Sequence, residues 1–158
     1  MGSGEKGAGE RGAGEKNSRL GIGLDIGSTA TKLVVLGADG ATAHTGLMPT
    51  GFSSVDAAAR ALASLEAAGL VPGEGARVVA TGYGRVAVPY ADKVVTEITC
   101  HARGAHYLDP SVRTVIDIGG QDSKVIRLDE NGAVENFVMN DKCAAGTGRF
   151  LEMMARTM

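Results

Sequence analysis

Two short segments of this sequence carry the residue types that can hold a phosphate group. The first runs from Asp25 to Lys32 as DIGSTATK, and the second runs from Asp117 to Lys124 as DIGGQDSK. Glycine lets the backbone approach an anion, and successive N–H groups of such a turn point at phosphate oxygens. An aspartate repels phosphate directly but can hold Mg²⁺, usually through water. Two such segments facing each other would hold the phosphates of a nucleotide between them.

This interpretation gives each residue a task. Asp25 and Asp117 are the candidate Mg²⁺ ligands, and Lys32 supplies positive charge near the phosphates. Backbone N–H groups and polar side chains would contact the nucleotide at Gly27, Ser28, Thr29, Gly119, Gly120 and Gln121. The alternative is two ordinary hairpins in which an aspartate caps a turn.

Two residues are candidates for the catalytic step. Gln121 could orient an attacking water, as glutamines do in other nucleotide hydrolases. Glu97 stands at the end of an apolar segment that we expect to be a strand, and it is a candidate base or ligand to a metal-bound water. A carboxylate that caps a helix is an equally good interpretation of Glu97.

Cys143 marks a second region with possible chemistry. A preceding Asn-Asp pair can cap a helix whose first turn then contains the thiol, where the helix dipole favours the metal-ligating thiolate. The small residues that follow, including the candidate cofactor-binding Gly146, let a group pack closely. No CxxC spacing is present, so a cluster would need ligands from elsewhere. The alternatives are inert packing and, less favoured, a zinc site made of Cys100, His101 and His106.

The elements that must position these residues form an internal repeat. Positions 25–41 align with 117–133 at a constant offset of 92, with seven of seventeen residues identical. Each copy is predicted to be strand, loop, strand, turn and strand; in the first copy the strands are 20–27, 31–37 and 41–48, with a turn at 38–40. A helix from about Cys143 to Thr157 follows the second copy. The repeat is too long for a solenoid and indicates a duplicated unit.

The rest of the pattern predicts an α/β protein. A helix is expected from Ser53 or Ser54, carrying Val55, Ala59, Leu62 and Leu65 and closed by Gly69. Further strands are expected at 76–81 and 93–98, and a helix at 99–108. We expect a disordered Gly/Glu/Lys tail at 1–19, a first lobe at 20–111 and the incomplete start of a second lobe at 112–158, with the C-terminal half of the protein missing.

Composition excludes several classes of function. The net charge is −2 and aromatic residues make up 4% with no Trp, which argues against nucleic-acid partners. No apolar segment is long enough to cross a membrane, and no signal peptide is recognisable. Two cysteines cannot build a disulfide framework. We therefore expect a cytoplasmic protein without membrane partners.

Four motifs resemble one family, namely GIGLDIGSTATKLVV, EITCHARGA, DIGGQDSK and especially NDKCAAGTGRFLEMMA. They are similar to the ATP-dependent activators (component A, or archerases) of 2-hydroxyacyl-CoA dehydratases, which are BadF/BadG/BcrA/BcrD-type ATPases. The resemblance covers about residues 20–158. It implies the ribonuclease H-like fold of the actin, hexokinase and acetate kinase (ASKHA) superfamily, with ATP or ADP and Mg²⁺ between two lobes.

The resemblance also implies a homodimer that holds one 4Fe-4S cluster at its interface, with two cysteines from each subunit. Cys143 would be one ligand, Cys100 is not at a ligand position, and the other ligand would lie beyond Met158. A reduced ferredoxin or flavodoxin would supply an electron, which ATP hydrolysis helps to pass to the dehydratase. Two alternatives remain open, a phosphotransferase such as an amino-sugar kinase and an actin-like or chaperone-like switch; the motif around Cys143 favours the activator.

Overall fold

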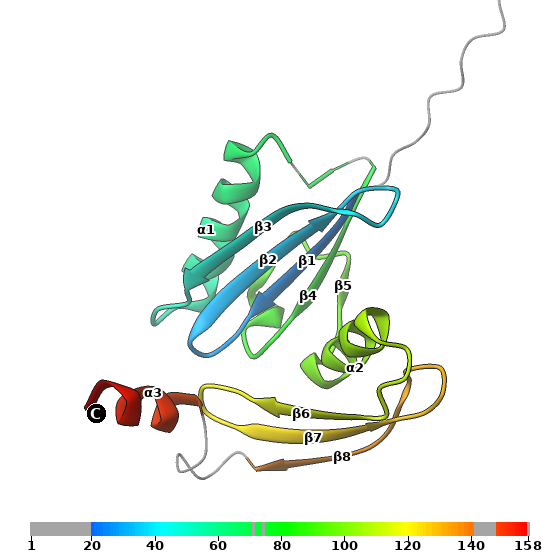
Figure 1. Ribbon diagram of the computed structural model, residues 1–158. Coiled ribbons are helices and arrows are strands. Elements are labelled where there is room, and N and C mark those ends of the chain that lie inside the picture. The colour runs from blue at the N-terminus through cyan, green and yellow to red at the C-terminus, as the bar shows by residue number, and fades with distance from the viewer. Residues whose placement is uncertain (1–19, 71, 74, 141–147, 158) are drawn as a thin grey trace, which may run out of the picture.

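A computed structural model of the chain describes residues 20–70, 72–73, 75–140 and 148–157. It contains two sheets, each built on a three-stranded antiparallel unit, with helix α2 (Glu97–Leu108) between them in sequence and in space (Figure 1). The first sheet has the order β3-β2-β1-β4-β5, in which β4 and β5 run parallel to β1. Its strands are β1 (Leu20–Ile26), β2 (Ala30–Leu36), β3 (Thr42–Pro49), β4 (Ala76–Thr81) and β5 (Lys93–Val94).

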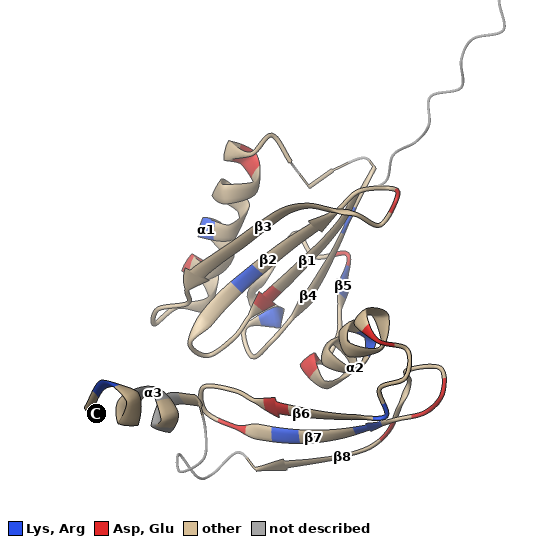
Figure 2. Cartoon of the chain, in the orientation of Figure 1, with Lys and Arg blue, Asp and Glu red and all other residues tan. Residues whose placement is uncertain are grey.

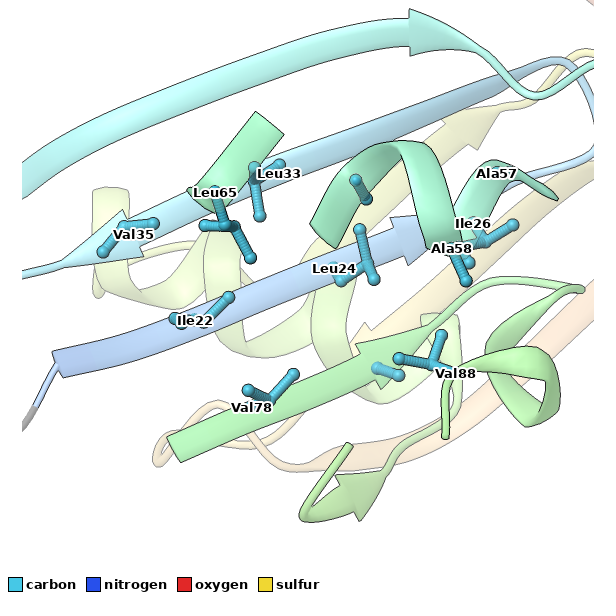
Figure 3. Packing of buried hydrophobic residues seen from close by; sticks show 12 residues of the cluster. Ile22, Leu24, Ile26, Leu33, Val35, Ala57, Ala58, Leu65, Val78 and Val88 are labelled. Atoms are coloured by element: carbon cyan, nitrogen blue, oxygen red, sulfur yellow. The ribbon is translucent and has the colours of Figure 1, made fainter. Parts of the chain in front are cut away.

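Helix α1 (Ser54–Ala67) covers one face of the first sheet and forms the main core with it (Figure 3). It begins as expected, because Ser53 accepts a hydrogen bond from the backbone N–H of Asp56 at 3.1 Å. Its buried face differs from the expected one, since Val55 and Ala59 are exposed. Small side chains let the helix approach the strands closely, and the buried positions are Ala57, Ala58, Ala61 and Leu65.

The expected strand at 93–98 is wrong beyond Val94. Thr96 adopts an extended conformation and caps α2, accepting a hydrogen bond from the N–H of Thr99, so Glu97 is the first residue of a helix. An acidic residue in the first turn is favoured by the helix dipole. A short 3-10 helix, η1 (Arg85–Ala87), lies between β4 and β5.

The second sheet has the order β6-β7-β8, with strands β6 (Thr114–Ile118), β7 (Ser123–Leu128) and β8 (Val134–Asn140). Helix α2 packs against it, and Ala102 forms a small core with Ile126 and Leu128. The domain boundary expected at residue 111 therefore falls after a helix that contacts the second sheet. Helix α3 (Gly148–Thr157) lies beyond the end of this sheet (Figure 1).

The duplication extends to the backbone hydrogen bonds. Gly40 and Gly132, which are 92 positions apart, both have positive φ angles, 79° and 73°, in the two hairpin turns. Both units have a register shift at the equivalent point, between residues 35 and 36 and between residues 127 and 128. The loop after the first strand closes in the same way in each copy, through the Gly27 N–H to Ala30 O bond and the Gly119 N–H to Asp122 O bond.

The two copies differ in what covers them. Leu24 is 1% exposed beneath α1, whereas Ile116, its counterpart at the same offset, is 71% exposed. The register places Ile116, Val125 and Val138 side by side, and together with Ile118 they form what we call the outer face of the second sheet. Helix α3 is the sequence counterpart of α1, but its described apolar side chains at 151, 153 and 154 are exposed.

Candidate functional site

A cavity of about 300 Å³ lies between the two Asp-Ile-Gly loops, where the first sheet faces the second. The structure brings nine of the predicted site residues to its wall: Asp25, Gly27, Ser28, Thr29, Lys32, Glu97, Asp117, Gly119 and Gly120. Gln121 is exposed and does not line the cavity. Cys143 and Gly146 lie outside the described residues.

The two loops are in direct contact at one point. A side chain at Gly120 would collide with the hydroxyl of Thr29 and come within 3.4 Å of its Cβ. Glycine at position 120 thus allows a loop of the second sheet to approach a loop of the first. This contact fixes the distance between the two groups of backbone N–H donors.

Each hairpin carries an Asp–Lys pair across its first two strands (Figure 2). In the first hairpin Lys32 Nζ lies 2.9 Å from Asp25 Oδ2, and the lysine side chain is 53% exposed. Solvent screens such a pair, so it adds little to stability. Lys32 is consequently a charged group that can move toward a ligand.

The second pair is built very differently, because Lys124 is only 2% exposed. Its Nζ lies 2.5 Å from Glu97 Oε1, 2.7 Å from Asp122 Oδ1 and 3.3 Å from Asp117 Oδ2. These three carboxylates come from α2, from the loop before β7 and from β6. A buried ammonium group is tolerated only when it is paired in this way.

The surroundings shift the pKa values of this cluster in the directions expected for ion pairs. Burial alone would lower the pKa of Lys124, but hydrogen bonds to Asp122 and Glu97 outweigh it and raise the pKa above its ordinary value. Burial alone would raise the pKa of Asp122, but hydrogen bonds from Lys124 and Tyr83 lower it below 3.8. Both groups are therefore charged at neutral pH.

Two further residues complete the wall. Tyr83 donates a hydrogen bond from its hydroxyl to Asp122 Oδ2 at 2.9 Å, and this bond raises the pKa of the phenol. His101 Nδ1 lies 3.1 Å from Asp117 Oδ2, but the nitrogen is buried and its geometry does not make a hydrogen bond. His101 thus presents a buried polar atom beside a candidate metal ligand.

The cavity lining has an excess of negative charge. Four carboxylates face two ammonium groups, which leaves −2 when His101 is neutral. An anionic ligand would be repelled unless it arrived with a cation.

Within the described residues, no group of three acidic, His or Cys side chains could by itself hold a metal ion. The zinc site considered for Cys100, His101 and His106 is therefore not formed. Carboxylate oxygens from Asp25 and Asp117 with few other ligands suit Mg²⁺, which keeps several waters or phosphate oxygens.

Sequence reasoning missed several residues on this wall. Lys124 could have been found, because the repeat makes it the counterpart of Lys32. Asp122 replaces Ala30 in the alignment, and this difference was a usable signal. Tyr83 gave no signal, and His101 was considered only as a zinc ligand, since each reaches the cavity through tertiary packing.

Comparisons with known proteins place the chain among a family of ATPases. Residues 22–158 match the model of the BadF/BadG/BcrA/BcrD ATPase family. The activator of lactoyl-CoA dehydratase from Anaerotignum propionicum is 50% identical over 140 residues, which is 87% of this chain and 53% of that protein. The (R)-2-hydroxyglutaryl-CoA dehydratase activating ATPase of Acidaminococcus fermentans is 46% identical over 87% of this chain and 53% of its own length. The chain thus spans about half the length of the curated relatives it matches.

Solved structures of other proteins share the fold of this chain. Component A of the (R)-2-hydroxyglutaryl-CoA dehydratase of Acidaminococcus fermentans has a TM-score of 0.79 at 46% identity, over 88% of this chain and 54% of that one. The activator of the 2-hydroxyisocaproyl-CoA dehydratase from Clostridium difficile, solved with bound ADPNP, has a TM-score of 0.77 at 46% identity, over 89% and 52%. The ethanolamine utilization protein EutJ of Carboxydothermus hydrogenoformans shares the fold alone, with a TM-score of 0.62 at 15% identity over 87% and 56%. The predicted fold class and family resemblance are confirmed. None of the described helices is long and apolar enough to cross a membrane.

Proposed function

This chain belongs to the BadF/BadG/BcrA/BcrD ATPase family, and on that premise we propose that it is the nucleotide-binding part of an activator of a 2-hydroxyacyl-CoA dehydratase or a related CoA-substrate reductase. The activator would hydrolyse ATP and pass a low-potential electron to that enzyme. The observation that carries the proposal is the cavity between two duplicated Asp-Ile-Gly loops. It is supported by a relative of the same fold, 46% identical, that was solved with ADPNP.

The nucleotide would enter together with Mg²⁺. The wall carries a net charge of −2, so polyphosphate can approach it only together with a divalent cation. Asp25 and Asp117 are the proposed carboxylates near the metal, one from each sheet. Serine and threonine hydroxyls at positions 28 and 29 and the N–H groups around Gly119 are the proposed phosphate donors.

Two residues are proposed to act on the attacking water. Glu97 lines the cavity at the first turn of α2, which supports its role as base or as ligand to a metal-bound water. Gln121 follows Gly120 directly in the chain, but its exposed side chain would have to turn inward to meet a nucleotide. Of the two, Glu97 has the stronger support.

The electron-transfer part of the proposal rests on the sequence motif and on the names of the relatives. Cys143 would supply one ligand to a 4Fe-4S cluster shared by a homodimer, and a ferredoxin or flavodoxin would be the electron donor. The other cysteine, Cys100, is half buried in α2, next to the cavity residue His101. The two cysteines therefore make a matched pair for experiment.

Nucleotide binding is tested by titrating the chain with ADPNP in the presence of Mg²⁺ and measuring the dissociation constant. Asp117→Asn should weaken binding about tenfold or more, because it removes a charge beside the metal. Asp56→Asn, which removes the same charge from the exposed part of α1, should leave binding unchanged. Equal affinities in the two variants would argue against Asp117 as a metal-site residue.

The cluster is tested by purifying the full product of the gene without oxygen and measuring iron, sulfide and the EPR spectrum. Cys143→Ala should lose the iron while ADPNP binding remains, and Cys100→Ala should retain both. An iron-free protein that phosphorylates a sugar would contradict the proposal and favour a kinase.

A further inference from the structure

The buried lysine of the second hairpin has a task beyond packing. We propose that Lys124 is an internal counter-cation, which holds Asp117 and Glu97 together while the cavity is empty and keeps them from binding a divalent cation unless a nucleotide comes with it. This inference rests on the proposed metal–nucleotide site and adds a rule for its loading. Lys124 is a positioning residue in this scheme, because it acts through the carboxylates.

The first argument is the geometry around the lysine nitrogen. Three carboxylates from three separate segments come within 3.3 Å of Nζ, and the side chain is closed off from solvent. One ammonium group neutralises only one of these carboxylates. The remaining charge of −2 in this cluster equals the charge that a divalent cation would balance. However, Lys124 Nζ already occupies the position between the carboxylates.

The second argument is that the three carboxylates are not equivalent. Asp122 is 5% exposed and is fixed from its other side by the hydroxyl of Tyr83, at 2.9 Å. Asp117 and Glu97 are about one-fifth exposed and line the cavity, where a metal would arrive. Asp122 can thus keep Lys124 in place when the other two carboxylates turn toward a metal.

The third argument comes from the duplication. Lys32 is the counterpart of Lys124, but its side chain is half exposed, and among the described residues Asp25 is the acid that pairs with it. Ala30 stands where the second hairpin has Asp122, so the first hairpin lacks this additional acid beside its lysine. A merely structural Asp–Lys pair would need no more than the first hairpin provides. The two additional acids around Lys124, Asp122 from the second hairpin and Glu97 from α2, therefore require an explanation that concerns the cavity.

The experiment is a Mn²⁺ titration of the 158-residue chain without nucleotide, followed by the EPR signal of free Mn²⁺. Wild type should bind Mn²⁺ weakly. Lys124→Met, which keeps the length of the side chain and removes its charge, should bind Mn²⁺ about tenfold more tightly or better. Lys93→Met removes a charge from an exposed position on β5 and should leave the affinity within about twofold of wild type.

A second variant gives a change of opposite sign and does not bury an unpaired charge. Asp122→Asn keeps the shape of the side chain but releases Lys124 entirely to Asp117 and Glu97, so Mn²⁺ binding should become about tenfold weaker. Circular dichroism and thermal unfolding establish that each variant is folded. If Lys124→Met does not fold, the Asp122→Asn titration decides the question alone.

Two results would overturn the inference: a folded Lys124→Met protein with unchanged or weaker Mn²⁺ affinity, or an Asp122→Asn protein with unchanged or tighter affinity. ADPNP binding in the presence of Mg²⁺ is measured separately on wild type. A wild-type chain that fails to bind ADPNP contradicts the proposed function, whereas the opposite shifts of the two variants test Lys124 without any nucleotide.

Discussion

The hydroxyl of Tyr83, from the loop after β4, donates a hydrogen bond to Asp122 in the loop before β7 and so joins the two sheets across the cavity wall. The bond is 2.9 Å long and ends on a carboxylate that also holds Lys124 at 2.7 Å. The relative placement of the two sheets and the position of the buried lysine are thus coupled through one side chain.

Removal of this hydroxyl should have a small but measurable effect. Tyr83 is more than half exposed, so we expect Tyr83→Phe to lower the free energy of unfolding by about 1 kcal/mol, as for an ordinary hydrogen bond. Tyr107→Phe, at a more exposed position on α2, should change it by less than about 0.5 kcal/mol. Urea denaturation of both variants measures the difference, and equal stabilities would show that the bond contributes nothing.

The lowered pKa of Asp122 predicts a loss of stability in acid. Because the folded-state pKa lies below the ordinary 3.8, the ionised carboxylate stabilises the fold above that pH. This contribution disappears as the pH falls through the folded-state pKa. The stability of wild type minus that of Asp122→Asn should therefore be constant near neutral pH and shrink below about pH 4. A difference that does not change down to pH 2 would contradict the assignment.

The contact between the two loops predicts a specific effect at Gly120. Gly120→Ala places a methyl group against Thr29 and should force the loops apart, so that ADPNP affinity falls about tenfold. Gly104→Ala is the control, because a side chain there meets no atom within 4 Å. It should leave affinity unchanged and stabilise α2 by about 0.5–1 kcal/mol. Similar ADPNP affinities for the two variants would contradict the importance of this contact.

The unequal cover of the two sheets gives a matched pair of core substitutions. Leu24→Ala should lower the free energy of unfolding by about 2–5 kcal/mol, because the side chain is fully enclosed beneath α1. Ile116→Ala, at the equivalent position of the outer face, should cost less than about 1 kcal/mol. Thermal or urea unfolding compares the two, and a large loss at Ile116 would mean that another surface packs on this face.

The structural features that the two copies of the repeat share could be predicted from the sequence. The offset of 92 predicted both hairpins and both turns, and it brought Asp25 and Asp117 to one cavity, because hydrogen-bond registers follow local patterns. It left open whether Glu97 ends a strand or begins a helix, since Thr96 can end a strand or cap a helix with equal ease. Nor did it predict the burial of Lys124, which depends on residues 27 positions away in α2. Tyr83 and His101 reach the wall for the same reason, through packing between segments that no local pattern relates.

The hairpins also have a consequence for the symmetry of the cleft. Their strand registers and turn hydrogen bonds correspond, so the contrast between an exposed and a buried lysine depends largely on side chains, among them Ala30 in one copy and Asp122 in the other. Ala30 already faces the cavity. Asp122 adds an acid on one side of the cavity at the position where the other side has Ala30, so the two halves of the binding site differ in charge although their hairpins correspond.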